Sequence, residues 1–177
     1  MKTALSALAT LALVLACTDT TAPAPDTRLA AGGLSASVNS GNGVVNRVSV
    51  GGSDQDVTLN TDANFSLTAI RYGDGSVGGE WSDQFGQGQG GVQVDVTCLV
   101  VAGNQAWIGG ITRAGGTGQG GVDLSGLPAL TRVVDLGTSA NDAPDAISFT
   151  FIGLAVQCTA QPNLPLFAMT GGQVTVN

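Results

Sequence analysis

NFSLTAIRYGDGSVGGEWSDQF (residues 64–85) is the stretch of sequence that decides the fold class. In its first half, successive side chains of an extended chain would point to opposite faces. One face would carry Phe65, Leu67, Ala69 and Arg71, and the other Ser66, Thr68, Ile70 and Tyr72. This period of two is typical of a half-buried strand. Asp74-Gly75 then favours a tight turn in which both central residues have positive φ. The stretch predicts a hairpin whose return strand runs from about Ser76 to Gln84.

Residues 91–113 form a second unit of this kind. Valines and a cysteine alternate with polar residues, and Gly103-Asn104 turns the chain into Ala106-Trp107-Ile108. The alternation gives way to the apolar run Leu99-Val100-Val101, which predicts that this strand end is covered on both faces. Trp107 falls on the face opposite both of its neighbours, so that face is either wet or covered by something the sequence does not identify.

The whole domain, residues 34–177, is expected to be all-β. The chain has 27 glycines in 177 residues, 5% aromatic and 11% charged residues, and no window with helical periodicity. Further strands are expected near residues 43–50, 56–59, 130–135, 147–152, 154–158, 166–170 and 173–176. Roughly eight to ten short antiparallel strands predict a single barrel or a sandwich, with the barrel preferred. The glycine-rich stretches 86–91 and 115–121 are interpreted as flexible connections, since neither a lysine nor a helix accompanies them as in a phosphate-binding loop.

The first sixteen residues have the features of a secretion signal. Lys2 supplies a positive start, residues 4–15 are apolar, and the small residue Ala16 precedes Cys17. A membrane span is the alternative, but the apolar run is only about a dozen residues long and a spanning helix needs about 20.

The sequence Val14-Leu15-Ala16-Cys17 resembles the lipobox of bacterial lipoproteins, with valine where the family prefers leucine. The resemblance implies that the Cys17 thiol receives a diacylglyceryl group, that cleavage follows Ala16, and that the new amino group is acylated. Residues 17–33 would then be the lipidated cysteine and a flexible tether. Thr18 replaces the aspartate that retains some lipoproteins on the inner membrane, so the resemblance favours the outer membrane or cell surface. An ordinary secretory signal is the alternative.

Two cysteines remain once Cys17 is assigned to lipid. Cys98 and Cys158 would lie in an oxidising compartment, so we expect them to form a disulfide. Closing a loop of about sixty residues would stabilise the fold by about 4 kcal/mol in the chain-entropy model. Two separate buried thiols are the alternative.

The side chains available for chemistry are few. The chain has no histidine, which removes the usual general base and the commonest transition-metal ligand. Glu80 is the only glutamate, and its neighbour Trp81 fits strand packing as well as a sugar platform, so a glycosidase is disfavoured. We predict no catalytic residues, no cofactor and no metal. Whether the protein is an enzyme stays open, and the sequence favours a protein that is not one.

Aspartates and aromatic residues offer two weaker possibilities for ligand binding. Aspartates occur as two pairs in loop-like segments, Asp54 with Asp56 and Asp142 with Asp145. They could supply calcium ligands, but we interpret them preferentially as solvated turn residues. Tyr72, Trp81 and Trp107, with Phe85, could line a ligand cavity if the sheet closes, although core packing explains them more simply. The arginines are scattered and the net charge is −7, so nucleic acid is not an expected partner.

A set of turn and strand motifs is spread over most of the domain: Gly41-Asn42-Gly43, Phe65-Ser66-Leu67-Thr68-Ala69, Asp74-Gly75-Ser76 with Gly79-Glu80, Val96-Thr97-Cys98-Leu99-Val100-Val101, Gly103-Asn104-Gln105-Ala106-Trp107-Ile108-Gly109-Gly110, Val134-Asp135-Leu136-Gly137, and Asp142 to Asp145. In these residues the domain resembles a group of small secreted bacterial domains without an assigned activity. The group often has an Asp-Asn-Gly turn where this chain has Asp135-Leu136-Gly137.

The expected function is a non-catalytic binding or structural role in the cell envelope. The membrane, reached through the lipid anchor, is the expected partner, with an envelope protein, a glycan or a small molecule as a further ligand. The alternative is a barrel that binds a small apolar ligand and performs simple isomerase-like chemistry. A filled interior favours the first, and an open pocket lined by Tyr72 or the tryptophans favours the second.

Overall fold

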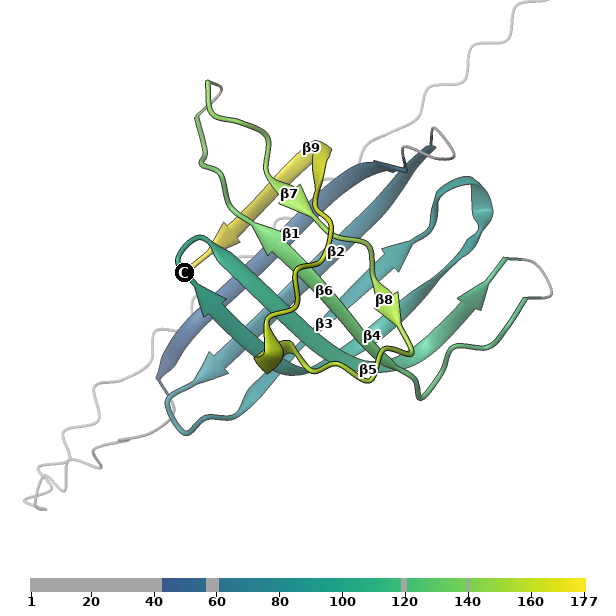
Figure 1. The fold of residues 1–177 in the computed structure, drawn as a ribbon, viewed down its shortest axis with the longest axis horizontal. Helices are drawn as coiled ribbons and strands as arrows, with labels where there is room; N and C mark the ends of the chain where they lie inside the picture. The colour runs from purple at the N-terminus through teal and green to yellow at the C-terminus, as the bar shows by residue number, and fades with distance from the viewer. Residues whose placement is uncertain (1–42, 57–60, 119–120, 140) are drawn as a thin grey trace, which may run out of the picture. The chain divides into compact units, whose positions relative to one another are not determined.

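The computed structural model describes residues 43–56, 61–118, 121–139 and 141–177, and within them the chain is all-β, as predicted (Figure 1). The elements in chain order are β1 (Val44–Asp56), β2 (Thr61–Tyr72), β3 (Val77–Gln84), η1 (Gly86–Gly88), β4 (Gly90–Ala102), β5 (Gln105–Thr117), β6 (Pro128–Val134), β7 (Ala146–Ile147), β8 (Phe151–Ile152), η2 (Cys158–Ala160) and β9 (Phe167–Val176). None of the helices in these ranges is long and apolar enough to cross a membrane. The expected signal, the tether and Cys17 lie outside the described residues.

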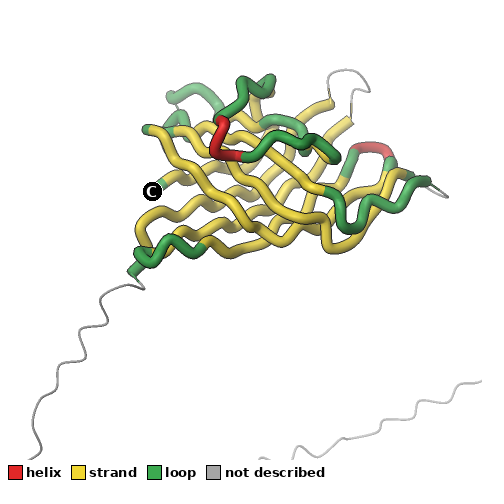
Figure 2. The backbone as a smooth tube through the Cα atoms, turned by 60° about the horizontal axis from the view of Figure 1, so that its bottom comes forward, coloured by secondary structure: helices red, strands yellow, loops and turns green. Residues whose placement is uncertain are grey.

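The strands form one antiparallel sheet that returns to itself. Their hydrogen-bonded order is β5-β4-β3-β2-β1-β9-β7-β6-β8, and β6 also pairs with β5. Eight strands therefore form a ring, to which β8 adds at β6. This closed path agrees with the barrel alternative, since a sandwich would keep two separate sheets. In Figure 2 the strands lie side by side and the helices and loops lie outside them.

The predicted hairpin of residues 64–85 is confirmed, with Leu67 opposite Trp81 in the register of β2 and β3. Its turn differs from the expectation, because Gly75 has a φ of 85° and Asp74 is not among the residues with positive φ. Tyr72 accepts the N–H of Gly75 and donates its own N–H to the carbonyl of Ser76. The connection is therefore a three-residue loop that needs one glycine in the left-handed region, and not the two-residue turn.

Alternation along the strands fills the interior of the ring with apolar side chains. The largest fully buried members of this interior cluster include Val48, Trp81, Val94, Ile108, Val133 and Val174. The second predicted unit is also confirmed, because Leu99 and Val101 pack into the interior cluster while Val100 packs against a separate cluster outside the ring. The strand end is covered on both faces, as its composition predicted.

A chain segment on the outside of the ring covers Trp107. Residues 153–166, hereafter the strap, cross β4, β5 and β6 before the chain enters β9 (Figure 1). The indole N–H of Trp107 donates to the carbonyl of Pro162 at 2.9 Å, and the Arg132 guanidinium lies 5.2 Å from the centre of the indole ring. Arg132 also donates to Asn163 and to the carbonyl of Leu164, so β6 fixes the far end of the strap.

Several strand predictions were wrong in the last third of the chain. Residues 154–158 form no strand. The strand expected at residues 147–152 is interrupted. The Ser148 hydroxyl accepts the backbone N–H of Arg132 at 2.8 Å, so a side chain takes the place of a backbone carbonyl in the pairing with β6. The two strands expected near the C-terminus are one strand, β9, which continues through Gly171 and Gly172 opposite β1.

The glycine-rich connections were also partly wrong. Gly90 and Gly91 lie in β4, opposite Thr117 and Gly116 of β5. A side chain at these glycines would collide with the backbone of a neighbouring strand, so glycine permits the close approach of the strands. Near the N-terminus, β1 is continuous to Asp56, and residues 57–59 lie outside the described residues.

Candidate functional site

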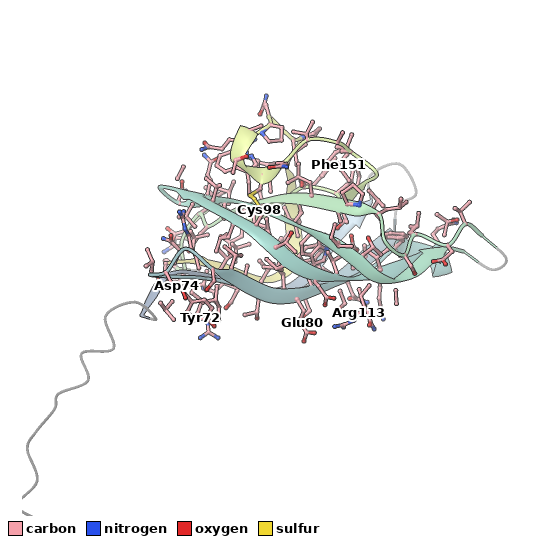
Figure 3. The ribbon with its side chains drawn as sticks, turned by 90° about the horizontal axis from the view of Figure 1, so that it is seen from below. Tyr72, Asp74, Glu80, Cys98, Arg113 and Phe151 are labelled. Atoms are coloured by element: carbon pink, nitrogen blue, oxygen red, sulfur yellow. A yellow bond between two sulfur atoms is a disulfide. The ribbon has the colours of Figure 1, made fainter. Side chains whose placement is uncertain are left out.

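The aromatic residues proposed as ligand-lining do not lie together. Trp81 is buried inside the ring, where its indole N–H has no partner among the described residues. Trp107 lies outside the ring in the second cluster, beneath the strap. Tyr72 is the last residue of β2 and is half-buried (Figure 3). Phe85 packs against the interior cluster.

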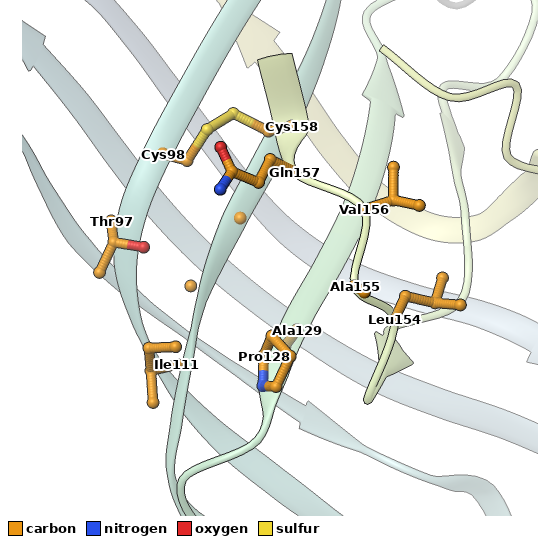
Figure 4. Close-up of a pocket in the computed structure, with 12 residues that line it drawn as sticks. Thr97, Cys98, Ile111, Pro128, Ala129, Leu154, Ala155, Val156, Gln157 and Cys158 are labelled. Carbon is orange, nitrogen blue, oxygen red and sulfur yellow. A yellow bond between two sulfur atoms is a disulfide. The ribbon is translucent and has the colours of Figure 1, made fainter. Parts of the chain in front are cut away.

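An apolar hollow lies outside the ring, beside the disulfide (Figure 4). It has a volume of about 450 Å³ and is hereafter called the groove. Strap residues Leu154 to Cys158 form one side, and Thr97 and Cys98 of β4 form the other. The floor is formed by β5 and β6 residues Gly109, Gly110, Ile111, Pro128 and Ala129.

Two sequence features keep this groove open. The predicted disulfide Cys98–Cys158 is present and holds the start of η2 over β4, with 6.1 Å between the two Cα atoms. Beneath it, a Cβ at Gly109 would lie 3.2 Å from the Cβ of Cys98 and 3.6 Å from that of Cys158. Glycine at this position leaves room both for the disulfide and for the floor of the groove. The register also shifts between Val96 and Cys98, which places Thr97 in a bulge at the rim.

The lining of the groove is apolar and uncharged. Ile111, Leu154 and Val156 expose 43%, 38% and 43% of their surfaces, although all three are large hydrophobic residues. The polar side chains are the Thr97 hydroxyl and the Gln157 amide, and none of the twelve lining residues is an aspartate, glutamate, lysine or arginine. Such a lining can hold an uncharged group but offers no acid or base for proton transfer.

A second, polar hollow of about 340 Å³ lies on the outer face of β2 to β5. There Arg113 donates to Asp95 at 2.8 Å and lies 3.6 Å from Glu80. Figure 3 shows Glu80 and Arg113 on the face opposite Cys98. These side chains are at least half exposed, so the ion pairs contribute little to stability. Trp81 faces the interior while Glu80 faces outward, so the two do not form a sugar platform.

The interpretation of the aspartates as solvated turn residues was wrong for Asp145. This residue is 6% exposed, and its carboxylate accepts the N–H of Leu136 at 2.7 Å and that of Val174 at 2.6 Å. The carboxylate of Asp135 similarly accepts the N–H of Val176 at 3.1 Å. The two carboxylates therefore accept backbone N–H groups of β9 that lie beyond the two residues of β9 paired with β7. Nothing in the spacing of the aspartates indicated this role.

Calcium binding gains no support from these loops. Asp142 is exposed and accepts the N–H of Ser139 at 2.9 Å. No group of three or more cysteine, aspartate or glutamate side chains that could hold a metal occurs in the described parts of the chain. The side chains of Asp54 and Asp56 lie outside the described residues.

Two exposed aspartates have lowered pKa values for a local reason. The Ser76 hydroxyl, and then its backbone N–H, donate to Asp74 at 2.6 and 2.8 Å and lower the pKa of that carboxyl. Ser125 lowers the pKa of Asp123 in the same way, at 2.7 and 2.9 Å. Both pairs stabilise turns and lie outside the groove.

No protein-family model, curated protein or solved structure matches this chain. The resemblance to small secreted bacterial domains and the lipobox at Cys17 therefore stay predictions from the sequence. The groove and its chemistry are what remain to suggest a function.

Proposed function

We propose that the protein is a lipid-anchored domain of the bacterial cell envelope with a non-catalytic binding role, and that the groove is its binding surface. One observation carries this proposal: side chains fill the interior of the ring, whereas an apolar groove stands open on the outside. Ligand sites in proteins are mostly concave, apolar and formed before the ligand arrives. The groove has these properties, because a disulfide and a glycine keep it open.

The composition of the groove supports binding over catalysis. General acid–base catalysis needs a titratable side chain within hydrogen-bonding reach of the reacting atom. The polar side chains of the groove are a hydroxyl and an amide, which fix the orientation of a ligand without exchanging protons at neutral pH.

The disulfide supports the extracytoplasmic location. Disulfides persist in oxidising compartments and are rare in the cytosol. A lipid on Cys17, followed by the tether of residues 17–33, would place the domain at the outer membrane or cell surface. The anchor is tested by growing cells with an alkyne-labelled fatty acid. The chain should incorporate the label, the Cys17→Ala variant should not, and the Cys98→Ala/Cys158→Ala variant should still do so. Labelling of Cys17→Ala would contradict the anchor.

A small apolar ligand is the second candidate, because a volume of about 450 Å³ lies in the range of small-molecule sites. This ligand would lie in the outer groove, since side chains fill the interior. Isomerase-like chemistry in this groove would have no acid or base among the lining residues.

Binding at the groove is tested with dansylamide, an uncharged dye that accepts excitation energy from tryptophan. The mature, lipidated protein in lipid nanodiscs should give saturable tryptophan-sensitised emission above that of empty nanodiscs, because Trp107 packs in one cluster with Cys98 and Cys158, which line the groove. Ile111→Asp should weaken binding by about tenfold or more, since the dye would desolvate a carboxylate. Val122→Asp is the matched control, because Val122 is 67% exposed and does not line the groove. Equal binding by both variants would show that the groove is not the site.

A further inference from the structure

We infer that the ligand of the groove is a polypeptide: an uncharged segment in extended conformation that pairs, as an added strand, with strap residues 154–157. The inference rests on the proposed function, because it names the partner class of that same groove. It goes further because it gives a hydrogen-bond partner to backbone N–H groups of the strap that have none within the described structure.

The backbone N–H groups of residues 154–157 are unpaired, whereas the Gln157 carbonyl accepts the N–H of Ala160 at 3.0 Å. These residues belong to no helix, strand or turn, and none of their four N–H groups has a hydrogen-bond partner in the described structure. All four residues are exposed, so their N–H groups are accessible to a partner, and a row of free N–H groups on a strand edge is a template for another chain. Strap residues 154–157 present such a row along one wall of the groove.

Both ends of this row are fixed. Gly153 donates its N–H to the carbonyl of Pro128 at 2.8 Å, and Cys158 is linked to Cys98 by the disulfide. Gln157 has φ −86° and ψ 156°, which is extended backbone. The segment is therefore held in place before a partner binds, and a partner strand would not have to order it.

The direction of the free donors favours a peptide over other apolar ligands. The backbone is extended at Gln157, and along an extended segment successive N–H groups point to opposite edges, so the edge that faces the groove carries alternate donors. A second peptide backbone supplies carbonyl groups at the matching spacing, whereas an acyl chain supplies none. The exposed side chains of Leu154 and Val156, and that of Ile111 in the floor, would then contact the side chains of the added strand.

Charge specifies which polypeptide segment fits. The chain has a net charge of −7, yet no charged residue lines the groove. A charged side chain placed there would lose hydration without gaining an ion pair. The segment that matches this electrostatic environment is uncharged, with small β-branched side chains that favour the extended conformation.

The test uses the blocked peptide acetyl-Thr-Val-Thr-Val-Thr-Val-amide and an analogue methylated on every backbone nitrogen, with the mature protein in lipid nanodiscs. The peptide should displace dansylamide and slow hydrogen exchange at alternate N–H groups of residues 154–157 by about tenfold or more. The methylated analogue keeps the side chains and carbonyls, but its N-methyl groups obstruct the close approach of two strands and it has lost the N–H donors that strand pairing also uses, so its affinity should be lower by about tenfold or more.

Two proline variants locate the pairing edge. Proline has no N–H, and Ala155 and Val156 are neighbours, so their N–H groups point to opposite edges. One of Ala155→Pro and Val156→Pro should weaken peptide binding by about tenfold or more, and the other should leave it unchanged. Dansylamide should bind both variants as it binds the unaltered protein, which reports that the groove is intact.

The outcomes separate this inference from the proposed function. Equal binding of the peptide and its methylated analogue, or no effect of either proline on peptide binding, would overturn the strand pairing while dansylamide binding left the groove as a site. Protection of residues 154–157 without peptide, together with dimers in sedimentation, would identify a second copy of this chain as the occupant and overturn the inference of a separate polypeptide. Absence of dansylamide binding would overturn both proposals.

Discussion

The Asp145 carboxylate accepts the backbone N–H of Val174 at 2.6 Å, which joins the loop before β7 to the strand that closes the ring. The same carboxylate accepts the N–H of Leu136, and the Asp145 carbonyl accepts the N–H of Met169 at 2.8 Å. Because β7 pairs with only two residues of β9, this side chain takes the place of a longer strand at the seam.

Replacing Asp145 should therefore cost more than replacing a neighbouring aspartate. Asp145→Ala leaves two N–H groups without partners, and each buried unsatisfied donor costs about 1–3 kcal/mol, so the free energy of unfolding should fall by about 3 kcal/mol. Asp142→Ala is the control, because Asp142 is exposed and a lost local hydrogen bond there should cost about 1 kcal/mol or less. Urea denaturation measures both. Equal losses would contradict the role given to Asp145.

How far the sequence predicts this structure depends on whether a residue's role is local. The hairpin around Leu67 and Trp81 follows from alternation and a turn signal within one short stretch. Residues 154–158 are mostly apolar and predicted a strand, but no strand lies beside them and the strand does not form. The groove was not predictable, because it combines a bulge at Thr97, a glycine at 109 and the strap, which only the folded chain brings together. Trp107 shows the difference between a local and a non-local role. The sequence predicted that its side chain faces away from those of its neighbours, but it did not predict that the strap covers it.

The disulfide between Cys98 and Cys158 should stabilise both the fold and the groove. Thiol labelling of the unfolded, unreduced mature protein should find neither cysteine free. The Cys98→Ala/Cys158→Ala variant should lose about 4 kcal/mol of unfolding free energy in the chain-entropy model, since the linked residues are 60 apart in sequence. The variant should also bind dansylamide more weakly, because the strap is no longer tied to β4. Unchanged dye binding would mean that the strap holds its position without the disulfide.

Two buried threonines should respond oppositely to the same substitution. The Thr112 hydroxyl is buried without a hydrogen-bond partner in the described structure, whereas the Thr131 hydroxyl lies 3.2 Å from that of Ser148. Thr112→Val keeps the shape and removes an unsatisfied polar group, so it should raise the free energy of unfolding by about 1 kcal/mol. Thr131→Val removes a satisfied one and should lower it by about 1 kcal/mol. Thermal and urea unfolding measure both, and a destabilised Thr112→Val would indicate that its hydroxyl has a partner such as buried water.

The turn of the β2–β3 hairpin should depend on pH through Asp74. Donation by the Ser76 hydroxyl, and then by its N–H, lowers the pKa of Asp74 below its ordinary value, so the folded state favours the charged carboxylate. Its contribution to stability is therefore fully present above the unfolded pKa and is lost as the pH falls through the lower, folded pKa. Ser76→Ala removes the hydroxyl donor and should raise the pKa of Asp74 toward its ordinary value, as measured by carbon NMR of the side-chain carboxyl. The pKa of Asp123 should not change, because its donors belong to Ser125. A parallel rise at Asp123 would point to a global change in the fold and contradict a local cause.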